Sequence, residues 1–399
     1  MKYAVALTAV LALALSACAD DGPAPDPGSS VGGTSSVAPA SVEPVVAVPG
    51  LAELGLERAT VSVAAQPGAV VDSADGLTLV PPADGEDVAV VHLGYDGKER
   101  WRHAVEAPDV DGDVRPRLSL DEGLGVVAVW FTRDSGSDNA EVVGDIHWYA
   151  LDDGEGGTLR PERADRTSRV ESWRGLVGYM SFPDAAGPST SVTYLDDTRE
   201  ARTLTWSGVL GAGEQSWLTG VVDGRPVYSV TDAEHRVQLH QGDRTVLTGA
   251  ASNTRWAALP SGVVAAVGVP GSNMVVVDRD GTVLLDHAGE CRTGSAVVAH
   301  GTQIWSGALL HDVGTGTTRC VDAVAEHGAE LTGMTPSGVA LARASDGALV
   351  LSEPAYGELR ETSVQVPVHA RDGYLLVEDT RDDERHVVSV FRADDLTLH

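Results

Sequence analysis

From about residue 56 to the end, short apolar runs alternate with clusters of Gly, Asp and Pro. The clearest runs are rich in valine and four to seven residues long: 88–91, 126–131, 263–269, 274–277 and 374–377. Runs of this length and composition, bounded by turn residues, are typical of buried β-strands. The only helical candidate is short, 51–58, and Gly55 weakens it.

Two β-hairpins follow directly from this pattern. Apolar segments at 192–195 and 201–206 flank the turn 196–199, and segments at 227–230 and 237–240 flank the turn 231–234. Polar turn residues between two such segments predict antiparallel strand pairs.

The hairpins recur along the chain. Segment 90–103 aligns without gaps with segment 274–287, so that Asp96-Gly97 matches Asp280-Gly281 and His103 matches His287. Weaker turns of the same kind are expected at 153–154, 196–197, 233–234, 314–316, 356–357 and 394–395. These eight turns are about 35 to 57 residues apart, which predicts repeating units of about 40 residues with four short strands each.

Such a unit is too small to be stable alone, so the units must pack on one another. Closing them into a ring buries their faces and leaves only short edges. We therefore predict an all-β fold, a β-propeller of eight four-stranded antiparallel blades over residues 51–399, with seven blades as the alternative. Three consecutive β-sandwiches, each of about 100 residues, explain the short spacing less well.

Segment 95–101, Tyr-Asp-Gly-Lys-Glu-Arg-Trp, resembles the end of the repeat in PQQ-like β-propellers. That family includes quinoprotein dehydrogenases and propeller lipoproteins of outer-membrane assembly. Segment 274–287 matches in part, without the tryptophan, and the other turns match only in outline. The resemblance implies that tryptophans pack between blades, although ordinary core positions are the preferred interpretation for Trp101, Trp130, Trp148, Trp173, Trp206, Trp217, Trp256 and Trp305.

The N-terminus has the pattern of an export signal. Lys2 precedes about 13 mostly apolar residues, too few for a membrane span of roughly 20 residues but typical of a secretory signal peptide. Residues 15–18, Leu-Ser-Ala-Cys, resemble a bacterial lipobox, which implies cleavage after residue 17 and acylation of Cys18, palmitate included. The alternative is an ordinary signal peptide with a chance cysteine.

Residues 18–50 contain mainly Ala, Pro, Gly, Ser, Val and Asp and no aromatic residue. Such a segment buries too little apolar surface to fold, so we expect a disordered tether. The expected location is outside the cytoplasm, with the protein anchored by membrane lipid through Cys18 to the outer side of the cell membrane, or in a periplasm.

The composition limits the possible partners. The chain has 58 acidic and 28 basic residues and a formal net charge of −30, which argues against nucleic-acid binding and favours cationic surfaces or peptides. Apart from Cys18, the cysteines are Cys291 and Cys320. An even pair in an exported domain predicts a disulfide, and a metal site is less well supported because neither has a Cys-x-x-Cys partner.

We find no catalytic, cofactor-binding or metal-binding constellation in the sequence. The only Gly-x-Ser-x-Gly motif, 28–32, lies in the tether and lacks the strand and helix of a nucleophile elbow. The histidines are scattered and no phosphate-binding loop occurs. The PQQ site, calcium ligands and adjacent cysteines of quinoprotein dehydrogenases cannot be placed, so no cofactor is predicted.

Asp109, Asp111 and Asp113 put three carboxylates at alternate positions, which leaves calcium binding open. The EF-hand pattern fails because Val114 and Leu120 stand where Gly and Glu are needed, and a solvated loop between blades is the other interpretation.

Two functions remain. The first, which we favour, is a monomeric lipoprotein whose propeller binds or scaffolds a protein or a small ligand on one face. The alternative is an extracytoplasmic enzyme, a quinoprotein-like dehydrogenase or a hydrolase or lyase. A convergent polar cluster at the ring centre would favour the enzyme.

Overall fold

A computed structural model describes part of the chain, in one compact unit, Ala40–His399, distinct from a second unit, Met1–Pro39. The described residues are 50–82, 87–121, 124–133, 141–160, 169–173, 176–181, 189–196, 198–207, 215–222, 225–231, 236–251, 254–258, 263–278, 280–294, 297–300, 302–335, 339–344, 347–351, 359–362, 364, 368–371, 373–382 and 385–396. The predicted signal peptide, Cys18, motif 28–32 and the tether up to residue 49 lie outside them.

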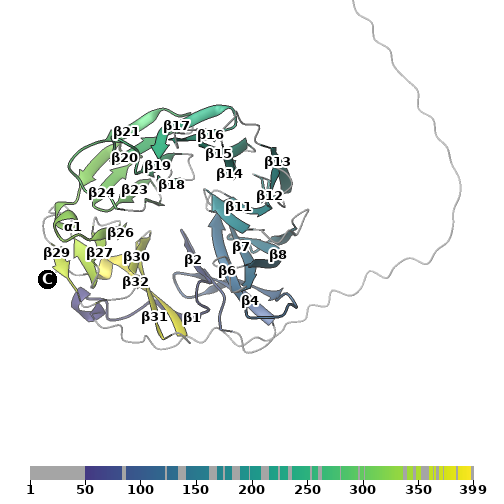
Figure 1. Ribbon diagram of the computed structural model, residues 1–399. Helices are drawn as coiled ribbons and strands as arrows, with labels where there is room; N and C mark the ends of the chain where they lie inside the picture. The colour runs from purple at the N-terminus through teal and green to yellow at the C-terminus, as the bar shows by residue number, and fades with distance from the viewer. Residues whose placement is uncertain are drawn as a thin grey trace, which may run out of the picture. The chain divides into compact units, whose positions relative to one another are not determined.

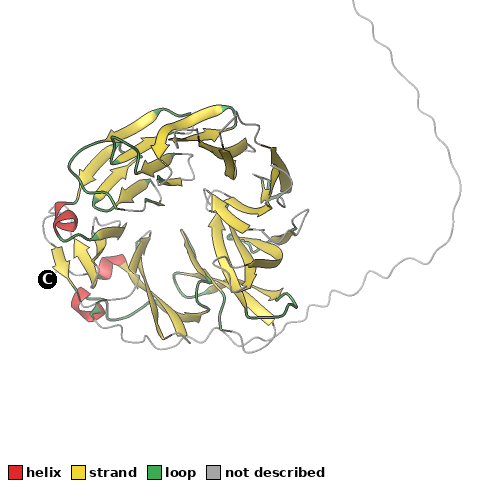
Figure 2. Ribbon diagram, in the orientation of Figure 1, coloured by secondary structure: helices red, strands yellow, loops and turns green. Residues whose placement is uncertain are grey.

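The described residues form almost only strands, with three short helices (Figure 2). The strands make eight four-stranded antiparallel sheets, numbered here from 1 to 8. Sheet 1 contains β2 (Val70–Ser73), β3 (Gly76–Leu79), β4 (Asp87–Gly94) and β5 (Glu99–Glu106). Sheet 2 contains β6 (Val114–Asp121), β7 (Val126–Arg133), β8 (Glu141–Ala150) and β9 (Gly156–Leu159). Sheet 3 contains β10 (Arg169–Trp173), β11 (Leu176–Ser181), β12 (Ser189–Leu195) and β13 (Ala201–Ser207).

The next four sheets repeat the same strand order. Sheet 4 contains β14 (Gln215–Val222), β15 (Arg225–Thr231), β16 (Arg236–Gln241) and β17 (Arg244–Ala251). Sheet 5 contains β18 (Arg255–Ala258), β19 (Val264–Val267), β20 (Met274–Val277) and β21 (Val283–His287). Sheet 6 contains β22 (Val298–His300), β23 (Gln303–Ser306), β24 (Leu309–Asp312) and β25 (Thr317–Cys320). Sheet 7 contains β26 (Glu330–Met334), β27 (Ala340–Ala344), β28 (Gly347–Leu351) and β29 (Leu359–Glu361).

Sheet 8 joins the two ends of the folded part. It contains β30 (Val368–Arg371), β31 (Tyr374–Asp382) and β32 (Arg385–Arg392), and its fourth strand is β1 (Val61–Ala65) from the N-terminal side. Val63 pairs with Val388, the Thr60 amide donates a 2.7 Å hydrogen bond to the Val390 carbonyl, and the Ser62 and Ser389 hydroxyls are 3.0 Å apart. The first strand therefore closes the last sheet.

The sheets follow one another in chain order, each beside the next (Figure 1). Apolar clusters fill most of the spaces between them, for example Val63, Leu77 and Val388 between sheets 8 and 1, Val90, Trp101 and Phe131 between sheets 1 and 2, and Met274, Ile304 and Leu331 across sheets 5 to 7. Radially packed four-stranded sheets of this kind are the architecture of a β-propeller. The predicted all-β class and the four-stranded antiparallel sheets are confirmed.

The short helical candidate is confirmed in part. A 3₁₀-helix, η1 (Leu51–Leu54), ends at Gly55, whose φ of 75° lies in the left-handed region that glycine adopts readily. Leu51, Leu54 and Leu56 are buried against sheets 7 and 8. The helices α1 (Asp322–Glu326) and η2 (Ala393–Asp395) were not predicted.

One predicted turn is wrong, and another joins a different pair of strands from the turns it was aligned with. Residues 394–395 lie in η2 and join no strands, because sheet 8 takes its fourth strand from the N-terminal side. In sheet 4, the hairpin predicted over 227–240 is confirmed, since β15 and β16 pair antiparallel, while its turn at 233–234 lies outside the described residues. The turn between the third and fourth strands of this sheet is at 242–243. The turn predicted at 356–357 also lies outside them.

Candidate functional site

The turns between the third and fourth strands of the sheets form an acidic set. We call the described residues of the turns at 95–98, 151–155, 196–200, 242–243, 278–282 and 313–316 the acidic turn surface. Alternating strand direction puts each of these turns at the same end of its sheet as the turn between the first two strands. Most of its carboxylates are exposed, including those of Asp96, Asp152, Glu155, Asp243 and Asp280.

Aspartates fix the shape of these turns. In several sheets the carboxylate of the aspartate that opens the turn accepts the backbone N–H two residues later, at 3.1 Å from Lys98 to Asp96, 2.8 Å from Glu155 to Asp153 and 2.9 Å from Asp280 to Asp278. Such side-chain bonds hold a turn in one conformation. The sequence predicted the turns, and the structure adds the reason that aspartate recurs in them.

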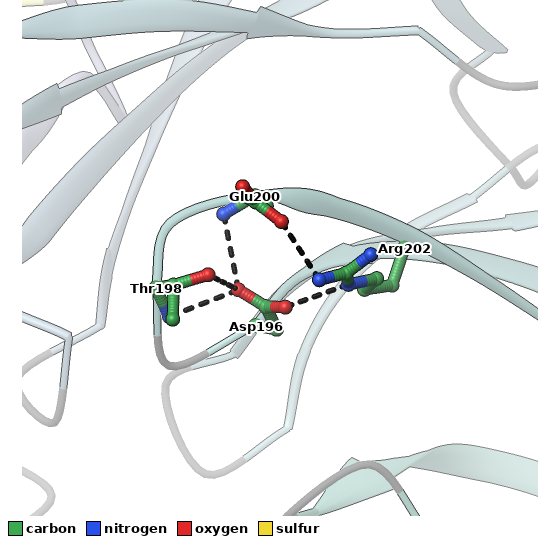
Figure 3. A network of polar contacts seen from close by, with 4 residues as sticks. All are labelled: Asp196, Thr198, Glu200 and Arg202. Carbon is green, nitrogen blue, oxygen red and sulfur yellow. Dashed lines mark hydrogen bonds and ion pairs between the residues drawn. The ribbon is translucent and has the colours of Figure 1, made fainter. Parts of the chain in front are cut away.

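The turn between β12 and β13 shows the most extensive network (Figure 3). The Asp196 carboxylate accepts hydrogen bonds from the Thr198 hydroxyl at 2.6 Å, the Thr198 and Glu200 amides at 2.9 and 3.1 Å, and Arg202 Nε at 2.7 Å. Arg202 also donates to Glu200 at 2.7 Å. The Thr198 hydroxyl, and then the Arg202 guanidinium, hold the pKa of Asp196 far below its usual range. Asp196 therefore keeps its negative charge throughout the physiological pH range.

Turns of neighbouring sheets touch one another. Arg199 donates to the Leu124 carbonyl of sheet 2 at 3.2 Å, Asp280 of sheet 5 forms an ion pair with Arg244 of sheet 4, and the rings of Tyr95 and Tyr374 stack with centroids 4.3 Å apart. These contacts place this end of sheet 2 beside sheet 3, sheet 4 beside sheet 5 and sheet 8 beside sheet 1.

Glycine allows the closest of these contacts. Gly154, with φ of 75°, lies over Trp101 of sheet 1, and a Cβ at this position would stand 2.8 Å from Trp101 Cγ. Trp101 is buried between sheets 1 and 2, and its indole N–H donates to the Leu151 carbonyl at 3.0 Å. This tryptophan thus packs between sheets, while the side chains of Trp173, Trp206 and Trp217 lie outside the described part.

Cys291 and Cys320 lie at disulfide distance, with Cα atoms 5.6 Å apart. Cys291 belongs to the connection between sheets 5 and 6, and Cys320 ends β25. The pairing predicted from the cysteine count therefore has matching geometry, and it ties this connection to the outer strand of sheet 6.

Asp109, Asp111 and Asp113 lie in the connection between sheets 1 and 2, at the opposite end from the acidic turn surface. The Asp113 carboxylate accepts hydrogen bonds from Arg115 at 2.8 and 3.0 Å. In the part of the chain that the structure describes, no three His, Cys, Asp or Glu side chains are grouped as metal ligands. These aspartates therefore do not converge on one point.

An apolar cleft lies between sheets 7 and 8, where η1 docks. Its lining includes Leu51, Leu54, Leu341, Val368 and Leu375. Most of this lining is aliphatic and belongs to the core cluster of the two sheets. The cleft is thus part of the surface on which η1 packs. No helix among the described residues is both long and apolar enough to cross a bilayer.

No protein-family model matches the chain, and no curated protein matches it. Similar solved structures include the computationally designed Ika8 protein, with 15% identity over 82% of this chain and 95% of that chain and a TM-score of 0.41. The β-propeller domain of the Trilobed protease from Pyrococcus furiosus has 10% identity over 82% and 97%, with a TM-score of 0.37. Sqt1 from Chaetomium thermophilum has 11% identity over 82% and 96%, with a TM-score of 0.38. Likenesses of this size support no inference about activity or partner, and the fold assignment rests on the sheets and their pairing.

Proposed function

We propose that the eight sheets are the blades of one closed propeller that acts as a binding or scaffolding module outside the cytoplasm. The module is a monomer held at the membrane by lipid on Cys18 through the tether that ends at residue 50. Closure is supported by the pairing of β1 with β32 and by packing of the sheets on their neighbours. The anchor is supported by the lipobox-like residues 15–18.

The acidic turn surface carries the binding proposal. Its turns are exposed, yet carboxylates such as those of Asp96, Asp153, Asp196 and Asp278 fix their backbones. A surface that is ordered before binding loses little conformational entropy when a partner docks. Its negative charge attracts cationic partners and raises their association rate. We therefore expect a basic protein segment or a cationic peptide to bind on this side.

A charge-matched pair of variants tests this surface. Asp152→Asn, Glu155→Gln and Asp243→Asn together remove three exposed charges, of which Asp152 lies 4.0 Å from the Arg199 guanidinium at ion-pair distance. We expect this variant to bind a fluorescent octa-lysine peptide about tenfold more weakly at low salt, since three partly screened charges contribute roughly 0.5 kcal/mol each. Fluorescence anisotropy of the full-length protein measures the affinity.

The control removes three charges at the other end of the sheets, with Asp109→Asn, Asp111→Asn and Asp113→Asn together. Both variants change the net charge equally, so the control should bind within about threefold of the unmodified chain. Equal weakening by the two variants would mean that only the net charge of the protein attracts the peptide, and the acidic turn surface would lose its role.

Labelling with an alkyne analogue of palmitate tests the anchor. The full-length chain, expressed in a bacterium from its own start, should incorporate the label and sediment with membranes. Cys18→Ala should do neither, because the acylated thiol is missing. Equal labelling of both proteins, or an unlabelled protein of native sequence, would contradict the lipid anchor without bearing on the peptide result.

A further inference from the structure

Three histidines on third strands each lie opposite a threonine of a neighbouring strand. His92 lies on β4, His240 on β16 and His311 on β24, each of which is the third strand of its sheet. The cross-strand partner of His92 is Thr78 on the second strand, while His240 and His311 lie opposite Thr245 and Thr318 on the fourth strands. Scattered spacing in the sequence hides this repeat, which the strand register reveals.

Each histidine contacts its threonine through the same ring atom. The distance from Nδ1 to the threonine Oγ1 is 3.0 Å at His92, 3.3 Å at His240 and 2.9 Å at His311. His92 is 1% exposed and His311 2% exposed, whereas His240 is half-buried. Aromatic rings stack on two of them, Trp101 on His92 and Tyr228 on His240.

The second ring nitrogen is left without a partner. Nε2 of all three histidines is buried and has no hydrogen-bond partner among the described residues. A neutral imidazole tolerates this arrangement, because Nδ1–H can donate to the hydroxyl while Nε2 carries only a lone pair. An imidazolium must carry a proton on both nitrogens. It would therefore bury a charge and an N–H group that finds no acceptor.

We propose that the repeated His–Thr pairs make packing of the propeller conditional on neutral imidazoles, so that the domain loosens when its surroundings become acidic. This device does not depend on what the propeller binds. Because the three histidines lie in sheets 1, 4 and 6, acidification weakens the domain at separate places along the chain. Several protons are therefore taken up together when the domain opens.

The charged groups around the histidines do not cancel the lowering of their pKa values by burial. Burial lowers the pKa of His92, and of the charges near it Asp75 raises that pKa while Arg100 lowers it. Burial also lowers the pKa of His311, against the opposing charge of Asp312. The pKa of His240 is lowered by burial.

Two more histidines lie close to these pairs or on a corresponding strand. The His103 ring also contacts Trp101, with centroids 5.4 Å apart, and its own Nε2 is buried without a partner among the described residues. His147 holds the corresponding third-strand place in sheet 2, opposite Thr158. Burial lowers the pKa of His147, with Asp145 raising it and Arg160 lowering it.

The direction of the pH effect follows from linkage. A histidine whose folded pKa lies below its unfolded value of about 6.5 binds its proton more readily in the unfolded chain. Its full contribution to stability is therefore present above about pH 6.5 and is lost as the pH falls from there towards the folded pKa. Each such histidine raises the unfolding equilibrium constant by up to about tenfold per pH unit in that window.

Urea unfolding of the full-length protein between pH 7.5 and pH 5.5 tests the proposal. The unfolding constant should rise by about 1,000-fold or more over this range, about tenfold for each of the three histidines. Replacing all three by asparagine, which keeps a polar atom near the Nδ1 position, should reduce the rise to about tenfold. The control His327→Asn changes an exposed histidine at the end of α1 and should leave the rise intact.

Hydrogen–deuterium exchange at the imidazole C2 position, followed by mass spectrometry, gives a separate reading for each histidine in the unmodified protein. The midpoints for His92, His240 and His311 should lie below 6.5, the value of an unperturbed imidazole. Midpoints near 6.5 for all three would overturn the proposal, as would a pH dependence that survives the triple variant. If the triple variant does not fold, the exchange midpoints alone decide.

Discussion

Val63→Asp should abolish the cooperative unfolding transition of the protein. Val63 is 2% exposed in the middle of β1 and lies in the cluster that joins sheet 8 to sheet 1. A carboxylate buried there without a partner costs at least about 4 kcal/mol, a large part of the total stability of a typical domain. The substituted residue also lies in the N-terminal strand that completes sheet 8. Soluble yield and urea unfolding followed by circular dichroism measure the loss.

Ala64→Asp is the matched control. Ala64 is the next residue of β1, and it is only partly buried because successive side chains point to opposite faces of a sheet. The same added charge should cost about 1 kcal/mol there, and the transition should remain cooperative. If Val63→Asp folds as well as this control, β1 does not close the domain in solution and the ring is held by other contacts.

Local pattern was enough to predict most strands. Segment 90–103 and segment 274–287 proved to be the hairpins β4–β5 and β20–β21, at equivalent places in sheets 1 and 5. The reason is physical: a strand buried between neighbours needs a short β-branched run, and a tight turn needs Asp or Gly. Both requirements act within a few residues, so the local sequence is enough to predict them.

Contacts between distant segments could not be predicted in this way. A turn was expected at 394–395 because Asp394-Asp395 resembles the other hairpin turns, yet the final sheet is completed by β1, more than 300 residues away. Nothing within either segment encodes this pairing. The same is true of Trp101, whose neighbour Gly154 belongs to the next sheet.

The candidate site was predicted only as a set of turns. The acidic residues at 96, 153 and 196 were expected in loops, but their carboxylate bonds to backbone amides depend on turn geometry that composition does not specify. The histidines were interpreted as scattered surface or strand residues, since their spacing is irregular. Their shared pairing with a threonine becomes visible only in the register of three separate sheets.

Gly154→Ala should destabilise the protein by about 2–4 kcal/mol. The φ of Gly154 is 75°, a conformation that costs an L-residue roughly 1–2 kcal/mol. In addition, the new methyl group would stand 2.8 Å from Trp101 Cγ and 3.0 Å from His103 Nε2. Both rings pack between sheets 1 and 2, so the turn must move away and the contact between the two sheets must loosen, which adds about 1–3 kcal/mol.

Gly316→Ala separates backbone strain from this steric clash. Gly316 lies in the corresponding turn of sheet 6, has a φ of 68°, and no atom lies within 4 Å of the Cβ it would gain. Both substitutions remove the same chain entropy from the unfolded state, so that contribution cancels in the comparison. Gly316→Ala should therefore cost only about 1 kcal/mol in urea unfolding at pH 7.5. Equal losses for the two variants would mean that the turn at Gly154 does not press on Trp101, and that packing between sheets 1 and 2 does not depend on a glycine there.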